Sequence, residues 1–238
     1  KTIGCFYIES PGMRNLLRKL QVNSFEMLIA ASSIIRPGVS ESGMMKAFIE
    51  RHQAASHLRE LVVAPYCGQK RFRLKQATTS RPYSGEWENS LMKEILEDTY
   101  GIMIYQEDVI KVAHKIAGMS LGEADSLRKC MSKKRDSQDI NTHRDRFVSG
   151  AIQNGVTKSS AEEIWRQIES FAGYAFCKAH SASFAILSYR TVYLKAHYPT
   201  EFMAAVLSNR GGFYDACAYT EEARRMGIQI LPPDIHLS

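Results

Sequence analysis

The stretch Phe171-Ala-Gly-Tyr-Ala-Phe-Cys-Lys-Ala-His-Ser-Ala-Ser-Phe184 joins an aromatic, glycine-containing loop to a long apolar run of good helix formers. Pro199 stops this run, so the sequence predicts a long helix over residues 181–197. Lys178 and His180 lie at the expected mouth of that helix, where the first backbone N–H groups have no partner within the helix. Cationic side chains beside such N–H groups are typical of a site that binds a polyanion.

Helical periodicity extends over most of the chain, which predicts a mainly α fold. The expected helices cover residues 13–20, 24–33, 42–51, 91–96, 107–117, 121–131, 181–197, 201–208 and 215–226, with another near Trp165. Capping boxes are expected at Ser120 with Glu123 and at Ser159 with Glu162. A few short strands are expected near residues 3–8, 61–75 and 228–231.

Size and composition indicate a globular domain with a substantial core. The chain has 238 residues, of which 45% are hydrophobic, and a formal net charge of +6. It holds no run of about 18 apolar residues, so we expect no membrane span. Because it begins at Lys1 rather than at methionine and ends just after an apolar stretch, we expect it to be a piece of a longer polypeptide.

Cysteine and histidine spacing gives no support for a disulfide framework or for a metal site. The five cysteines, at positions 5, 67, 130, 177 and 217, are scattered and form no Cys-x-x-Cys pair. His52 and His57 are five residues apart, which turns them away from a common helix face. We therefore expect a reducing, cytoplasmic location and no metal ligands in this chain.

Basic residues gather in two runs, and this concentration favours nucleic acid as a partner over a uniformly solvated surface. The first run contains Lys70, Arg71, Arg73 and Lys75, and the second contains Arg128, Lys129, Lys133, Lys134 and Arg135. A simpler explanation is that the second run complements the negative end of a helix dipole. Likewise, His180 could be a helix cap and Lys178 a solvated loop residue.

Several motifs, taken in order, resemble the fingers region of the alpha subunit of bacterial DNA polymerase III, the C-family replicative polymerase. Besides residues 171–184, they are Glu9–Met13, Arg36-Pro-Gly38, Gly101–Val109, Ala117–Lys129, Met131–Lys134, Leu194–Pro199 and Leu231–Asp234. The resemblance implies that residues 1–238 form a multi-helix fingers domain excised from a longer chain. Its expected subregions are an N-terminal strand and helices (1–50), a variable basic insert (51–88), a helical nucleotide- and DNA-contacting core (89–210), and a C-terminal helix with a short strand (211–238).

The resemblance also implies roles for individual residues. Those expected to bind the incoming nucleotide are Arg128, Lys129, Lys178, His180, Tyr174 and Cys177. The two basic runs, rather than the resemblance, predict contacts to the DNA backbone from Lys133, Lys134, Arg135, Lys70, Arg71 and Arg73, with solvated faces as the alternative. Two positions depart from the pattern, since Lys129 replaces an arginine of many relatives and Cys177 replaces an asparagine. Lysine cannot form the bidentate guanidinium fork, and a thiol is a weak hydrogen-bond partner.

The chemistry of the family requires carboxylates that this sequence lacks. Nucleotidyl transfer uses two Mg²⁺ ions, and the family binds them through an Asp-x-Asp motif in its palm. No Asp-x-Asp occurs in this chain, so we expect no catalytic residue and no bound cofactor here, with Mg²⁺ acting in the parent DNA-directed DNA polymerase. The implied partners are template-primer DNA, deoxynucleoside triphosphates, the palm and thumb of the parent chain, and the sliding clamp and other replisome subunits, with no membrane.

Two alternatives remain open from the sequence. The chain could be a stand-alone nucleic-acid-binding module without a catalytic parent. It could also be the fingers of an error-prone paralogue, an alternative that Cys177 supports. An Asp-x-Asp motif in a longer reading frame would argue against the first alternative, and the fidelity of the full enzyme would test the second.

Overall fold

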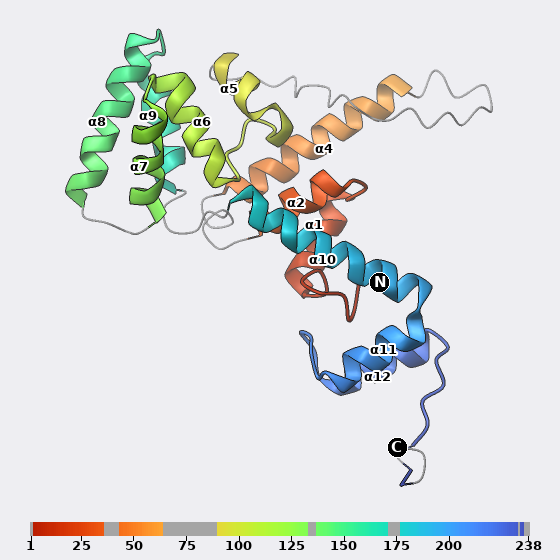
Figure 1. The fold of residues 1–238 in the computed structure, drawn as a ribbon. Helices are drawn as coiled ribbons and strands as arrows, with labels where there is room; N and C mark the ends of the chain where they lie inside the picture. The colour runs from red at the N-terminus through yellow and green to blue at the C-terminus, as the bar shows by residue number, and fades with distance from the viewer. Residues whose placement is uncertain are drawn as a thin grey trace. The chain divides into compact units, whose positions relative to one another are not determined.

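The computed structural model describes residues 2–35, 43–63, 90–132, 137–170, 177–232 and 234–235. All regular elements within these ranges are helical, which confirms the mainly α prediction (Figure 1). They are α1 (Pro11–Leu20), α2 (Phe25–Ile34), α4 (Met44–Val63), α5 (Ser90–Leu96), the 3₁₀ turn η2 (Glu97–Thr99), α6 (Gln106–Ala117), α7 (Leu121–Ser132), α8 (Ser137–Gln153), α9 (Lys158–Ser170), α10 (Lys178–His197), α11 (Pro199–Ser208) and α12 (Ala216–Arg225).

The strand expected at residues 3–8 is wrong, because this segment forms turns. Side chains of α10, rather than a neighbouring strand, satisfy its carbonyl groups. Lys195 Nζ donates to the carbonyl oxygen of Ile3 at 2.6 Å, and Ser188 Oγ donates to that of Phe6 at 3.0 Å. The apolar pattern that predicted a strand therefore reflects burial against a helix.

The other expected strands are also not found where the structure describes them. Residues 228–231 have no regular structure. Residues 61–63 belong to the last turn of α4. The remainder of the predicted strand, residues 64–75, lies outside the described residues.

Helix starts agree with the sequence in part. In the capping box that opens α7, the Ser120 N–H donates to Glu123 Oε2 at 2.7 Å and the Glu123 N–H donates to Ser120 Oγ at 3.2 Å. The box expected at Ser159 is wrong, because α9 begins earlier and Thr157 Oγ1 accepts the N–H of Ser160 at 3.2 Å. A threonine two residues upstream thus takes the capping role.

Proline and glycine mark several helix ends. Pro11 opens α1 and Pro199 opens α11, where the missing N–H is harmless. Gly227 follows α12 with φ +82°, a left-handed conformation that costs glycine little. No helix of the described residues is both long and apolar enough to cross a membrane.

The chain divides into two compact units, which we call the terminal unit (residues 1–29 and 182–238) and the central unit (residues 30–181). In the central unit, α6 packs against α5, α7 and α8, and α9 packs against α8, as the helices coloured from yellow (α5) through green to teal in Figure 1 show. Phe147 and Ile164 are fully buried in this bundle. The subdivision by role that the sequence suggests stays a prediction.

Two helices of the bundle approach so closely that one residue must be glycine. A Cβ atom built on Gly150 of α8 would lie 2.1 Å from the carbonyl oxygen of Ala117 at the end of α6. No real side chain fits at that distance, so the contact between α6 and α8 depends on this glycine.

In the terminal unit, α11 packs against α12 and buried polar groups join distant segments. The carboxylate of Glu9 accepts hydrogen bonds from the N–H groups of Gly4 and Phe213, both at 2.7 Å, and from the Tyr219 hydroxyl at 3.1 Å. Glu9 is 4% exposed, so these bonds replace its lost hydration.

Candidate functional site

The start of α6 is the platform of the candidate site, and a buried carboxylate fixes its backbone. Asp108 Oδ2 accepts the N–H of Ile104 at 3.0 Å and the N–H of Tyr105 at 2.9 Å. Burial raises the pKa of Asp108 above its ordinary value, although both N–H bonds act in the opposite direction. These bonds hold the backbone that presents Tyr105, Gln106 and Glu107.

Arg128 lies on α7 and reaches the start of α6. Its Nε donates to Asp125 Oδ1 at 2.9 Å, and its Nη1 donates to Gln106 Oε1 at 3.2 Å. Lys129 Nζ lies 2.8 Å from the other oxygen of Asp125, but its side chain is 61% exposed, compared with 24% for Arg128. Hydrogen bonds from Lys129 and Arg128 lower the pKa of Asp125. One carboxylate thus offsets part of the charge of two cations.

Lys178 is the first residue of α10 and also contacts the start of α6. Its backbone N–H donates to both carboxylate oxygens of Glu107, at 2.9 and 3.1 Å. Its Nζ lies 5.3 Å from the centroid of the Tyr105 ring, within the range of a cation–π contact. Burial raises the pKa of Tyr105, so its phenol stays neutral at physiological pH.

The predicted start of α10 needs a correction. The helix begins at Lys178, three residues before the expected Ser181, so Lys178 and His180 belong to its first turn rather than to a preceding loop. Cys177 directly precedes the helix, and its carbonyl oxygen accepts the N–H of Ser181 at 3.3 Å. Cys177 therefore occupies the N-cap position, and the alternative that assigned this position to His180 is wrong. The side chains of Cys177 and His180 are half-buried, and that of Lys178 is exposed.

Three consecutive residues bring the two predicted cations to one place. Gln106 contacts Arg128, while Tyr105 and Glu107 contact Lys178. The positions 128 and 178 are far apart in the sequence, yet both side chains border the start of α6. Arg128 and Lys178 thus contact neighbouring residues at the start of α6, and their role in binding a nucleotide stays a prediction.

The acceptors of this site, Gln106, Glu107 and Asp125, were not predicted as site residues, although the first two lie within the motif Gly101–Val109. An acid or amide three or four residues from a cation on one helix is a detectable signal, and Asp125 has this spacing to Arg128 and Lys129. The contacts across helices, from Gln106 and Glu107, have no such local signal.

Several predicted site residues lie outside the described ranges. Of the predicted nucleotide-binding residues, Tyr174 lies outside them. All the predicted DNA contacts also lie outside them: Lys133, Lys134, Arg135, Lys70, Arg71 and Arg73. Their roles stay predictions. Within the described residues, no three side chains of His, Cys, Asp or Glu form a group that could hold a metal ion.

The arrangement can attract an anion, but one position is already occupied by a carboxylate of the protein. Arg128 and Lys178 supply positive charge next to the first turn of α10, where the helix dipole also favours negative charge. Glu107 accepts the first N–H of that helix, which is a typical contact of a bound phosphate. A phosphate group at this turn would have to displace Glu107 or bind beside it.

The sequence of the chain is similar to known proteins of one family. The family model for the bacterial DNA polymerase III alpha subunit finger domain matches residues 1–155. The DNA polymerase III subunit alpha of Pasteurella multocida is 40% identical over 243 residues, which cover 99% of this chain and 18% of the relative. The subunits of Vibrio cholerae and Escherichia coli K12 are 40% and 39% identical over 237 residues, with the same two coverages. The chain thus spans about a fifth of the length of these relatives.

Proposed function

Because the chain belongs to the bacterial DNA polymerase III alpha subunit finger domain family, we propose that it forms the fingers of a DNA-directed DNA polymerase that acts in bacterial DNA replication. In this role it binds the triphosphate of the incoming deoxynucleotide and grips template-primer DNA. The observation that carries the proposal is that Arg128 contacts Gln106 while Lys178 contacts its two neighbours, Tyr105 and Glu107, at the start of α6.

The chemistry of these side chains fits a triphosphate. The Arg128 guanidinium is planar and always charged, and two of its nitrogens are already oriented by Asp125 and Gln106. Lys178 adds an exposed point charge at a helix start. Oriented cations stabilise the negative charge that develops on the phosphoryl oxygens during nucleotidyl transfer, which lowers the barrier of the chemical step.

The carboxylate of Glu107 competes with the triphosphate for the first turn of α10. It neutralises the first turn of α10 while no nucleotide is bound, and a triphosphate takes its place through stronger, multiply charged contacts. Lys129 is held mainly by Asp125 and contributes as a diffuse charge. Because lysine replaces arginine at this position, the side chain still attracts the triphosphate but orients its oxygens less than an arginine would.

We propose that the two magnesium ions of the reaction bind outside this chain. The sequence has no Asp-x-Asp, and the described residues form no acidic cluster for two metal ions. We assign the metal-binding carboxylates to a palm domain elsewhere in the same polypeptide, which also carries a thumb domain. The sliding clamp and other replisome subunits then bind the parent protein. The role of this chain is to bind and orient phosphate.

A primer-extension assay tests this proposal. The 238-residue chain alone should extend no primer at any magnesium concentration, whereas the longer polypeptide that carries it should incorporate nucleotides as the template directs. Incorporation by a clean preparation of the chain alone would contradict the assignment of catalysis to a palm. A longer polypeptide that binds DNA but never extends a primer would support the stand-alone binding module instead.

A further inference from the structure

A buried carboxylate in the terminal unit is shared by two cations. Glu222 of α12 is 4% exposed; its Oε1 accepts a hydrogen bond from Lys195 Nζ at 2.6 Å, and its Oε2 accepts one from Arg225 Nη2. Burial acts to raise the pKa of Glu222, but the bond and charge of Lys195, together with Arg225, outweigh it and lower that pKa. Glu222 is therefore ionised at neutral pH, and both of its oxygens are in use.

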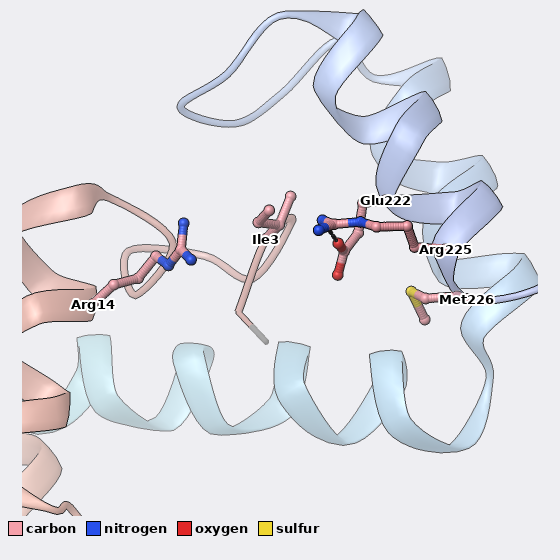
Figure 2. Close-up of a pocket in the computed structure, with 5 residues that line it drawn as sticks. All are labelled: Ile3, Arg14, Glu222, Arg225 and Met226. Carbon is pink, nitrogen blue, oxygen red and sulfur yellow. Dashed lines mark hydrogen bonds and ion pairs between the residues drawn. The ribbon is translucent and has the colours of Figure 1, made fainter.

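A pocket of about 140 Å³ lies beside this group, with Ile3, Arg14, Glu222, Arg225 and Met226 as its lining (Figure 2). Arg14 comes from α1 and points toward the pocket from the side opposite α12. A water molecule in the liquid takes up about 30 Å³, so the volume can hold a tetrahedral oxyanion.

Arg14 has no counter-charge among the residues that the structure describes. Its side chain makes no ion pair or hydrogen bond with any of them. The neighbouring Glu221 is exposed and pairs with Arg224, and the carboxylate of Glu9 is taken up by Gly4, Phe213 and Tyr219. Glu222 is thus paired with Lys195 and Arg225, and the charge of Arg14 is not balanced by any described residue.

We propose that this pocket binds a phosphate group, with the guanidinium groups of Arg14 and Arg225 as its ligands. Three cations and one carboxylate leave an excess of two positive charges around the pocket. The planar forks of two arginines match the oxygens of a phosphate better than they match a small halide ion. Ile3 and Met226 form apolar walls, and a less polar wall strengthens the attraction between the charges.

The phosphate could be free inorganic phosphate or a backbone phosphate of DNA, and the two share this chemistry. The site is distinct from the one proposed for the nucleotide, because all of its residues belong to the terminal unit. Its experiments therefore do not depend on the roles of Arg128 and Lys178.

Inorganic phosphate is the first probe. We expect phosphate, added to the 238-residue chain at constant ionic strength against chloride, to raise the melting temperature. Arg14→Gln should abolish the rise and Arg14→Lys should keep part of it. Arg18→Gln is the matched control, since Arg18 is exposed on the same helix and does not line the pocket. Because Arg14 has no described partner, its replacement is not expected to unfold the chain.

A short DNA duplex is the second probe, and it separates the two sources. If a backbone phosphate fills the pocket, Arg14→Gln should reduce the slope of log affinity against log salt by about 0.9, and Arg18→Gln should not. If free phosphate is the occupant, Arg14→Gln should lose the rise in melting temperature with phosphate but keep the salt slope of DNA binding. Arg14→Gln that matches Arg18→Gln in both assays would overturn the proposal.

Discussion

The carboxylate of Glu107 accepts the backbone N–H of Lys178 at 2.9 and 3.1 Å, although the two residues are 71 positions apart. The start of α10 is therefore capped by an acid from α6. This contact holds Lys178 beside the Tyr105 ring before any ligand binds. It also means that the proposed phosphate site holds an anion of the protein itself.

Glu107→Gln should therefore lower the free energy of unfolding by about 0.3–1 kcal/mol, the usual worth of an acid at a partly exposed helix start. Urea unfolding measures this change. Glu169→Gln is the control, because Glu169 is exposed in the last turn of α9, where an acid opposes the dipole. Equal losses for both variants would argue against a capping role for Glu107.

Glu222→Gln should cost about 3–5 kcal/mol at pH 7, because Lys195 would stay buried without its counter-charge. Glu221→Gln, one residue away and 62% exposed, should cost less than about 1 kcal/mol. Chemical unfolding of both variants gives the comparison. Similar costs would show that the buried ion pair adds no stability beyond that of a surface pair.

The same variant has a defined pH dependence. The pKa of Glu222 in the folded chain is below its ordinary value of 4.5, so the charge stabilises the fold fully above about pH 4.5. This contribution is lost as the pH falls through the folded pKa. The stability gap between the parent chain and Glu222→Gln should therefore be constant from pH 7 to 5 and should narrow below 4.5. A stability difference that grows as the pH falls would contradict a lowered pKa of Glu222 in the folded chain.

Gly150→Ala should destabilise the central unit by about 1–3 kcal/mol or more, because its Cβ would lie 2.1 Å from the Ala117 carbonyl oxygen. Gly122→Ala offers a matched control in α7, where a Cβ would meet nothing within 4 Å. Alanine there should raise stability by up to about 1 kcal/mol. A tolerated Gly150→Ala would mean that α6 and α8 pack less closely than the structure shows.

The basic runs can be tested through the salt dependence of DNA binding. If Lys133, Lys134 and Arg135 contact the duplex backbone, their joint replacement by glutamine should reduce the slope of log affinity against log salt by about two to three. The triple replacement of Lys70, Arg71 and Arg73 tests the other run separately. Unchanged slopes for both variants would indicate solvated faces without DNA contacts.

The helices were predictable from the sequence because their signals are local. Apolar spacing, the capping box at Ser120, and Pro11 and Pro199 at helix starts act within a few residues. The start of α9 was misplaced because Thr157 and Ser159 offer equally good caps, and only the packing of the helix decides between them.

The strands and the acceptors of the site could not be predicted in the same way. The apolar residues 3–8 suit a strand as well as a buried turn, and Lys195 and Ser188, almost 200 positions away, decide the outcome. The family resemblance identified Arg128 and Lys178, which the structure places at one helix start. It did not identify Glu107, whose role follows only from the contact between α6 and α10.

The most direct test of the account is single-turnover nucleotide incorporation by the polymerase that carries this chain, with Lys178→Gln compared with Lys158→Gln. Both lysines are exposed first residues of a helix, but only Lys178 borders Tyr105 and Glu107. A charge-assisted phosphate contact is worth about 1.5–3 kcal/mol, so Lys178→Gln should lower the incorporation rate per encounter about tenfold or more. Thermal stability and the rate of Lys158→Gln should stay close to those of the parent. Equal incorporation rates for the two variants would contradict the nucleotide site proposed at the start of α10.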